Sequence, residues 1–352
     1  MELGEGLKGL PGPILVTGHT GFKGSWLMML LNHLSIPAVG FSLPPEPESL
    51  YLRADLFGKN REHFGDIRDL SEVEKVFQMF APSAVLHMAA QPLVLKSYEE
   101  PLETFDINII GTANVLTTAL ATPEVKVIGV VTTDKVYKNE NSGVSFRESD
   151  PLEGKDPYSA SKVGTEAVVS AWRNISELNC GPQIISLRAG NVVGGGDFAE
   201  NRLLPDLIRA QMNQESLVVR NPKSTRPWQH VLDPLCGYVS TLDKALSLKI
   251  SNAYNFGPMA ESLSVERVIG IAKELLGDSI QIVASDNPVH EANEAVALSI
   301  NPSRAYKELG WEPLWTQEKA ITMTLEWWDK VLNSGVSAIE ACAHDIASID
   351  RG

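Results

Sequence analysis

The chain has 352 residues, of which 43% are hydrophobic and 21% charged, and its formal net charge is −14. At about 150 residues per domain, this length predicts two domains, or one large domain with a smaller lobe, in an ordinary soluble globular protein. The net charge is acidic and no basic stripe offsets it, which argues against nucleic acid as a partner. No apolar run approaches the ~20 residues of a transmembrane helix, which argues against a membrane.

The three cysteines form neither a disulfide framework nor a CxxC pair, and the acidic N-terminal stretch lacks the apolar region of a signal peptide. We therefore expect a protein of the reducing cytoplasm. No cluster of His, Cys and Asp has the spacing of metal ligands, so no metal is expected.

Apolar, strand-like runs alternate with helical segments through the first 190 residues. Several of these strands have no polar face, which is typical of a parallel sheet covered by helices on both sides. The pattern predicts a doubly wound, Rossmann-type α/β fold. After residue 193 the alternation gives way to glycines, prolines and short mixed segments, which predict a smaller C-terminal lobe. Strands are expected at 13–18, 38–43, 84–90, 125–134, 183–192 and 252–258, and helices from 22 and at 72–80, 101–120 and 157–177.

The first strand is followed by "TGHTGFKG", which places Gly18, Gly21 and Gly24 between a strand and a helix. Glycines at such a turn allow a tight bend and close approach of a pyrophosphate, which the N–H groups of the helix start then bind. This context predicts a dinucleotide site. His19, inside the turn, is expected to face solvent. Further cofactor contacts are expected from Phe22, Asp66, Ile67 and Ala89.

Two positions bear on the choice of dinucleotide. Asp66 can accept a hydrogen bond from an adenine amino group, although an aspartate that only shapes a turn is an equally good interpretation. Ser42 stands where an acid would bind the ribose 2′-hydroxyl of NAD, and residues 36–52 contain no Lys or Arg to bind a 2′-phosphate. The missing cation favours NAD over NADP.

The strand at 125–134 ends in Thr133 and Asp134, followed by Lys135, and ligands of doubly wound sheets bind beyond the carboxyl ends of strands. Downstream, "YSASK" places Tyr158 and Lys162 four residues apart on one helix face. An ammonium beside a phenol is expected to lower its pKa from about 10 and so to make a general base. Alone, YxxxK could be a surface tyrosine beside a solvated lysine.

Together these motifs resemble the extended short-chain dehydrogenase/reductases, which include NAD-dependent epimerases and dehydratases, and more narrowly the CDP-glucose 4,6-dehydratases. The resemblance covers residues 10–340. The glycine turn and YxxxK occur throughout the superfamily, whereas "AGNVVGGGD" and "RNPKSTRPWQHV" are far more specific. It is carried by "VTGHTGFKGSWL" (16–27), "HMAAQPLV" (87–94), "DPYSASK" (156–162), "RAGNVVGGGDFAENRLLPD" (188–206), "RNPKSTRPWQHVLDPLCGY" (220–238), "NFGP" (255–258) and "HEA" (290–292).

The resemblance implies a reaction and roles. Tyr158, helped by Thr133, takes the proton of the sugar 4-hydroxyl while C4 gives a hydride to NAD. Water then leaves across C5 and C6 with Asp134 as the acid, and the hydride returns to C6. Tyr158 and Lys162 also contact NAD. Lys135 stands where related enzymes have a glutamate, and acts either as a neutral base or only by positioning Asp134.

The resemblance also implies a nucleotide-diphosphate-sugar substrate and a homodimer or homotetramer, formed through helices 101–120 and 157–177, in deoxysugar synthesis for lipopolysaccharide O-antigen. Residues 1–192 are expected to bind mainly NAD, and residues 193–352 mainly the nucleotide sugar, with strands returning to the first domain at about 230–258. Candidate substrate contacts are Asn191, Arg202, Arg220, Arg226 and His290, of which His290 could equally be structural.

Some features depart from this pattern. The loop 139–148, expected beside the sugar, lacks a tryptophan-containing stretch associated with CDP-glucose dehydratases, and the residues after "HEA" fit loosely. A dehydratase or 4-epimerase for another nucleotide sugar is therefore an alternative, as is a regulator that binds NAD without catalysis. The Asp134–Lys135 pair argues against an epimerase, and the presence of Tyr158 and Lys162 against a regulator.

Overall fold

The computed structural model describes residues 3–141, 143–219, 221–250, 252–277, 281–284 and 297–351. Two predicted substrate residues, Arg220 and His290, lie outside these described residues.

The centre of the molecule is a seven-stranded sheet in the order β11-β6-β5-β4-β1-β2-β3, and every neighbouring pair is parallel. This confirms the predicted doubly wound fold. The first strand, β1, lies between β4 and β2, so the chain winds away from it in both directions. The strands are β1 (Ile14–Thr17), β2 (Ala38–Ser42), β3 (Arg61–Phe64), β4 (Ala84–His87), β5 (Val127–Val131), β6 (Gln183–Ala189) and β11 (Ala253–Phe256).

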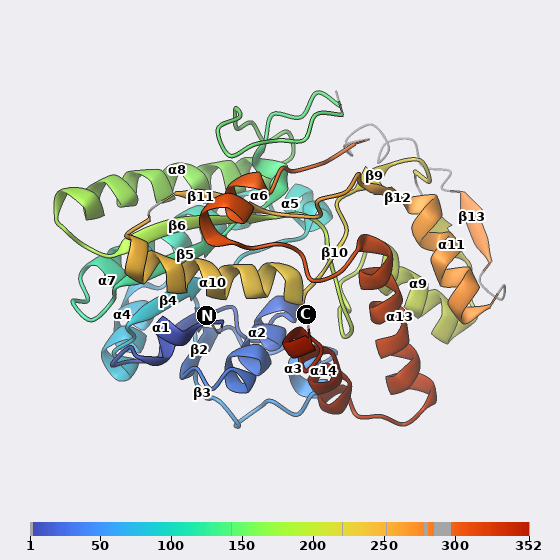
Figure 1. Ribbon diagram of the computed structural model, residues 1–352, viewed down its shortest axis with the longest axis horizontal. Coiled ribbons are helices and arrows are strands. Elements are labelled where there is room, and N and C mark those ends of the chain that lie inside the picture. The colour runs from blue at the N-terminus through green and yellow to red at the C-terminus, as the bar shows by residue number, and fades with distance from the viewer. Residues whose placement is uncertain are drawn as a thin grey trace.

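Both faces of the sheet are buried by helices. Because successive side chains of one strand point to opposite sides, each strand contributes residues to both faces. In β1, Ile14 and Val16 join one hydrophobic core and Leu15 joins the other. The first core is completed by α1 (Glu5–Lys8), α2 (Phe22–His33) and α10 (Leu232–Leu248), and the second by α4 (Leu70–Phe80), α7 (Thr112–Leu120) and α8 (Pro157–Leu178). In Figure 1, α8 and α10 are drawn on either side of the sheet.

Local sequence explains where two of these helices begin. Asp69 precedes α4 and accepts hydrogen bonds from the backbone N–H groups of Ser71 and Glu72. Asp156 does the same for α8 toward Ser159, and Pro157 occupies the first helical turn, where its missing N–H costs nothing. The start of α8, and with it the position of Tyr158, is thus encoded in "DPYS".

The segment predicted as one helix at 101–120 is helical throughout but divides into three parts. These are α6 (Pro101–Phe105), a π-helical segment η1 (Asp106–Gly111) and α7. Asn108, in η1, donates its side-chain amide to the Gln91 carbonyl oxygen (3.1 Å) and to Ser161 Oγ (2.8 Å). The shorter elements of this half are α3 (Leu50–Arg53), α5 (Val94–Glu99) and η2 (Asp134–Val136).

The C-terminal region is more helical than the sequence indicated. Figure 1 shows α9, α11 and α13 gathered at the end of the molecule away from α7 and α8. The strand β11, from this half of the sequence, pairs with β6 of the main sheet. The domain boundary at residue 192 stays a prediction. The remaining elements are β7 (Val192–Val193), α9 (Leu203–Asn213), β8 (Leu217–Val219), β9 (Thr225–Arg226), β10 (Gln229–His230), β12 (Leu263–Ser264), α11 (Val265–Leu276), β13 (Ile282–Ala284), η3 (Ala305–Leu309), α13 (Gln317–Asn333), α14 (Ala338–Ile346) and η4 (Ile349–Arg351).

Among the described residues, no helix combines the length and the apolar character needed to cross a bilayer.

Candidate active site

The glycine turn between β1 and α2 forms a cradle that side chains would fill. Gly18 has φ +75°, and a Cβ there would lie 2.8 Å from the backbone nitrogen of Ala89. A Cβ on Gly24 would lie 2.1 Å from the Gly18 carbonyl oxygen. Because β4 and β2 flank β1, this turn lies where the strand order reverses, and α2 begins there at Phe22. The backbone therefore fits a dinucleotide pyrophosphate.

His19 does not face solvent as predicted, because it is fully buried. Its Nε2 lies 2.9 Å from Glu62 Oε2, and Glu62 also accepts a hydrogen bond from Tyr51. The imidazole fits against the sheet because residue 40 is glycine, where a Cβ would come within 2.4 Å of the ring. His19 therefore helps to pack the turn onto β2 and β3.

The predicted adenine contact, Asp66, already has a partner. Arg68 donates Nη2 to Asp66 Oδ2 (2.6 Å) and its backbone N–H to Oδ1 (2.9 Å). Ser42 is buried, with its Oγ 2.6 Å from Thr20 Oγ1. Contacts of Asp66, Ile67 and Phe22 with a cofactor stay predictions.

The strand β5 ends at Val131, three residues earlier than predicted, and the chain then turns into η2. Thr133 precedes this turn and its Oγ1 accepts a hydrogen bond from the Lys135 N–H (3.3 Å). The same hydroxyl donates to Asp134 Oδ1 (3.1 Å). The polar residues after β5 are thus held at the sheet edge by a local turn.

Asp134 is 2% exposed, and its Oδ2 has no hydrogen-bond partner among the described residues. Burial raises its pKa to about 6, although the charges of Lys135, Arg226 and Lys23 and the Thr133 hydrogen bond oppose the rise. Such a carboxyl can hold a proton close to neutral pH and give it up to a group that reaches Oδ2.

Tyr158 and Lys162 are both buried on α8, as expected for one face of a helix, and the Tyr158 hydroxyl shares a hydrogen bond with Thr133. The predicted fall in the Tyr158 pKa is wrong for this structure. Burial raises the pKa of the phenol to about 12, and the Asp134 charge adds to this rise. Burial also lowers the pKa of Lys162 to about 8, and its Nζ donates to the Val131 carbonyl oxygen (3.4 Å).

Sequence reasoning missed a third cation beside these groups. Lys23, in the first turn of α2, donates Nζ to the buried hydroxyl of Tyr238 (3.2 Å). Burial lowers its pKa to about 7, with help from the charges of Arg202 and Lys162. The signal in the sequence was a lysine between Phe22 and Gly24, where the cofactor is expected to bind. Nothing in the sequence pointed to Tyr238, which comes from α10.

The predicted substrate residues within the described part of the chain differ in how close they lie to this cluster. Arg202, just before α9, pairs its Nη1 with Asp197 Oδ2 (2.9 Å), and this carboxylate raises the arginine pKa. Arg226, in β9, is buried and its charge acts on Asp134. Asn191 is half-buried, and its backbone oxygen accepts from the Gln229 N–H (3.0 Å). The structure thus brings Arg202 close to Tyr158 and Arg226 close to Asp134.

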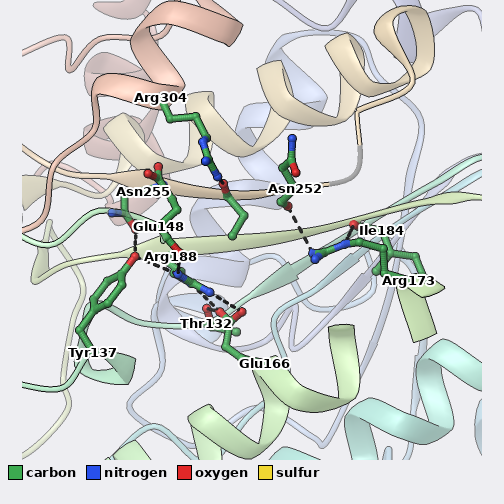
Figure 2. Close-up of polar contacts among 11 residues, drawn as sticks. Thr132, Tyr137, Glu148, Glu166, Arg173, Ile184, Arg188, Asn252, Asn255 and Arg304 are labelled. Atoms are coloured by element: carbon green, nitrogen blue, oxygen red, sulfur yellow. Dashed lines mark hydrogen bonds and ion pairs between the residues drawn. The ribbon is translucent and has the colours of Figure 1, made fainter. Parts of the chain in front are cut away.

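Behind the cluster lies a buried ion pair that the sequence analysis did not single out (Figure 2). Arg188 of β6 donates Nε and Nη2 to the two carboxylate oxygens of Glu166 on α8, each at 2.8 Å. Arg188 Nη1 also donates to Tyr137 Oη (2.9 Å) and to the Glu148 carbonyl oxygen (3.2 Å). The available signal was a glutamate four residues after Lys162, on the same buried helix face.

Among the described residues, no group of three or more His, Cys, Asp or Glu side chains is arranged to hold a metal ion.

A family model described as GDP-mannose 4,6 dehydratase matches residues 15–324. The chain belongs to this family. A CDP-glucose 4,6-dehydratase from Salmonella typhimurium is 40% identical over 324 residues, covering 89% of each chain. A dTDP-glucose 4,6-dehydratase from Haemophilus influenzae is 27% identical, covering 90% of this chain and 97% of the relative. The resemblance inferred from the motifs is confirmed.

Solved structures share the fold. UDP-glucose 4-epimerase from Thermotoga maritima, solved with UDP-glucose, aligns with a TM-score of 0.80 at 22% identity, covering 91% of this chain and all of that one. A dTDP-glucose 4,6-dehydratase from Streptomyces venezuelae with NAD and TYD bound aligns with a TM-score of 0.77 at 24% identity, covering 92% and 98%. Epimerases and dehydratases thus share this fold, so the site must distinguish them.

Proposed function

We propose that this protein is an NAD-dependent nucleotide-sugar 4,6-dehydratase, a hydro-lyase that converts CDP-glucose to CDP-4-keto-6-deoxyglucose. The relative with 40% identity across 89% of the chain supports the substrate. The observation that carries the reaction type is Asp134, a buried carboxyl with a pKa of about 6 beside Thr133 and Tyr158. Removal of a 6-hydroxyl as water needs such an acid, whereas epimerisation at C4 does not.

The first step needs a base at the sugar 4-hydroxyl. Tyr158 takes this proton as its phenolate, and Thr133 donates a hydrogen bond to the same oxygen. Because burial raises the pKa of Tyr158, the phenolate requires nearby cations. Arg202, whose charge lowers the pKa of the phenol, and Lys162, one helical turn away, are the candidates. Bound NAD supplies the hydride acceptor at C4 and the hydride donor at C6.

The second step removes water across C5 and C6. Asp134 in its protonated form gives its proton to the departing 6-hydroxyl, which leaves as water. The proton at C5, acidified by the 4-ketone, must pass to a base. Lys135, half-buried on the same turn, is the candidate, with positioning of Asp134 as its alternative role.

The remaining candidates would hold the ligands. Gly18, Gly21 and Gly24 form the pyrophosphate cradle of the cofactor, bordered by Ala89. Arg202 and Arg226 would supply the positive charge that a nucleotide diphosphate requires, and Asn191 stays a predicted substrate contact. Arg220 and His290 stay predictions outside the described residues.

The proposal includes a homodimer or homotetramer in the cytoplasm, acting in deoxysugar synthesis for lipopolysaccharide O-antigen. The three cysteines are free thiols, as in a reducing compartment. On the helices expected to pair, Ile110 and Leu102 are 50% and 86% exposed, whereas Leu116 belongs to the core. Sedimentation at micromolar concentration should give at least a dimer, and a monomer would contradict this part of the proposal.

A panel of nucleotide sugars analysed by mass spectrometry tests the reaction. CDP-glucose should give a product lighter by one water. The yields of dehydrated product from UDP-, dTDP- and GDP-sugars measure the preference for the nucleobase. A product of unchanged mass that separates from the substrate would favour the 4-epimerase alternative. Recovery of unchanged substrate throughout the panel would favour the third alternative, a regulator that binds NAD without catalysis.

Calorimetry tests the cofactor. Because residues 36–52 contain no Lys or Arg, NAD should bind more tightly than NADP. The opposite preference would contradict our interpretation of this segment.

A further inference from the structure

One face of α8 contacts three consecutive residues where β5 ends. Tyr158 shares a hydrogen bond with Thr133, and Lys162 donates to the carbonyl oxygen of Val131. One turn further, Glu166 Oε1 accepts a hydrogen bond from Thr132 Oγ1 at 2.6 Å. The spacing of four residues places the three helix positions in one row. Glu166 is therefore one of three attachments between the helix and the strand end.

Glu166 is held as a charge. Its side chain and that of Arg188 are each 5% exposed, and the arginine fork satisfies both carboxylate oxygens. Burial acts to raise the Glu166 pKa, but the hydrogen bonds and charge of Arg188 outweigh it and hold the pKa below its usual value. A buried pair of this kind is costly unless hydrogen bonds compensate for the lost water, and here every nitrogen of the guanidinium and both carboxylate oxygens have a partner.

Arg188 extends the connection to the loop that follows η2 (Figure 2). It donates to Tyr137, whose hydroxyl in turn donates to Asn255 Oδ1 (2.6 Å) on β11. It also donates to the carbonyl oxygen of Glu148, at the end of the loop expected beside the sugar. The ion pair thus joins α8, the end of β5 and this loop.

The charged or titratable groups that interact with Lys162 come from three elements. On α8, Glu166 opposes the effect of burial and raises the Lys162 pKa. On β4, His87 is neutral because burial lowers its pKa to about 3. On α2, Lys23 is a like charge that disfavours a second cation. Of these groups, Glu166 is the one that favours the ammonium form of Lys162.

We propose that Glu166 is a positioning residue for the dehydration. Its carboxylate, fixed by Arg188, holds the bend at Val131–Asp134 against α8 and places a negative charge one helical turn from Lys162. This inference rests on the proposed function, because it assigns Glu166 to that same reaction, which it serves through its neighbours and without touching the substrate.

The test compares the pH dependence of kcat/KM on CDP-glucose for the parent, Glu166→Gln and Glu166→Asp. Replacing the carboxylate with an amide removes its attraction for the ammonium and leaves Arg188 as an unbalanced cation. The alkaline limb of the profile, where Lys162 loses its proton, should then move about one pH unit lower. Glu166→Asp keeps the charge, so it should leave the alkaline limb in place. Its side chain is shorter, so it should hold the bend less well and lower kcat.

Arg173→Met is the matched control. Arg173 also ties α8 to neighbouring strands, donating Nε to the Ile184 carbonyl oxygen (2.9 Å), but it has no hydrogen bond to the 131–134 bend among the described residues (Figure 2). This variant should lose stability without moving the alkaline limb. If Glu166→Gln is too unstable to purify, Glu166→Gln combined with Arg188→Met removes both buried charges and should still show the lower limb.

Hydrogen exchange of residues 130–137, read by mass spectrometry, tests the inference without turnover. It should rise in Glu166→Gln and stay at the parent rate in Arg173→Met. An unmoved limb together with unchanged exchange would reduce Glu166 to an ordinary core ion pair. If the parent dehydrates no nucleotide sugar, the proposed function fails, while a selective rise in exchange would still support the attachment of the bend by Glu166.

Discussion

Two carboxylates, Asp134 and Glu166, are both buried near the end of β5, but they differ in their hydrogen bonds and in the direction of their pKa shifts. Asp134 has one oxygen without a partner among the described residues, and burial raises its pKa to about 6. Glu166 has both oxygens bound by Arg188 and one also by Thr132, and its pKa is held low. Burial is common to both, so the hydrogen bonds and the charge of Arg188, which only Glu166 has, decide which carboxyl can carry a proton.

This difference separates two regions with different tasks. The reactive region contains Thr133, Asp134, Tyr158 and Lys162. Here pKa values lie far from their usual range, and Oδ2 of Asp134 has no partner in the part of the chain that the structure describes. The supporting region contains Glu166, Arg188 and Tyr137, where polar groups are satisfied by one another. Substitutions in the first should impair chemistry directly, and substitutions in the second should reduce stability and affect chemistry only through neighbouring residues.

The largest effect is expected in the reactive region. Tyr158→Phe should lower turnover of CDP-glucose by about 10²- to 10⁴-fold, because the base for the first step is lost. No reduced cofactor should be seen by absorbance after mixing with substrate. Its melting temperature should stay close to that of the parent, since the ring remains. Reduced cofactor formed at the parent rate would mean that another group removes the proton of the 4-hydroxyl.

In the supporting region, Glu166→Gln should lower the free energy of unfolding by about 3–5 kcal/mol, because Arg188 is left as an unpaired buried charge. Denaturation with urea at neutral pH measures this. The double variant with Arg188→Met should recover much of the loss. A single variant as stable as the parent would show that water reaches this ion pair.

Asp134→Asn should have the opposite effect on stability at neutral pH. The folded pKa of Asp134 is raised from 3.8 to about 6, so proton binding stabilises the fold fully below pH 3.8 and this contribution is lost as pH rises through 6. At about 1.4 kcal/mol per pKa unit, the buried charge costs roughly 3 kcal/mol at pH 7.5. The inactive variant should therefore be more stable than the parent at pH 7.5, with the difference disappearing near pH 4. An equal difference at both pH values would exclude titration as its cause.

The smallest effect is expected at Lys135, which is half-buried on the same turn as Asp134. Lys135→Ala should still bind NAD and CDP-glucose and form reduced cofactor, but lose water about 10²-fold more slowly. Stopped-flow absorbance follows the first step and mass spectrometry the second. Turnover at the parent rate would leave the lysine without a role at C5 or C6. A failure to form reduced cofactor with both ligands bound would place that role in the first step.

The sequence predicted the sheet, the glycine turn and the helix bearing Tyr158 and Lys162, because these depend on local patterns. An apolar run closed by glycine predicts β1, and "DPYS" determines where α8 begins. It could not predict that Tyr158 has a raised pKa, because burial at the site depends on packing by segments far apart in the sequence. Tyr238 and Arg188 were missed for the same reason, since they reach the site from α10 and β6.

The most direct test of this account is the protonation state of the two carboxylates. Infrared difference spectra between pH 5 and pH 8 detect the carbonyl band of a protonated carboxylic acid. We predict a band that disappears with a midpoint near pH 6, that is absent from Asp134→Asn and that persists in Glu166→Gln. The band of Asp233, whose pKa burial raises to about 7, should remain in both variants. A band that persists in Asp134→Asn and is absent from Glu166→Gln would contradict the division between a proton-carrying Asp134 and a permanently charged Glu166.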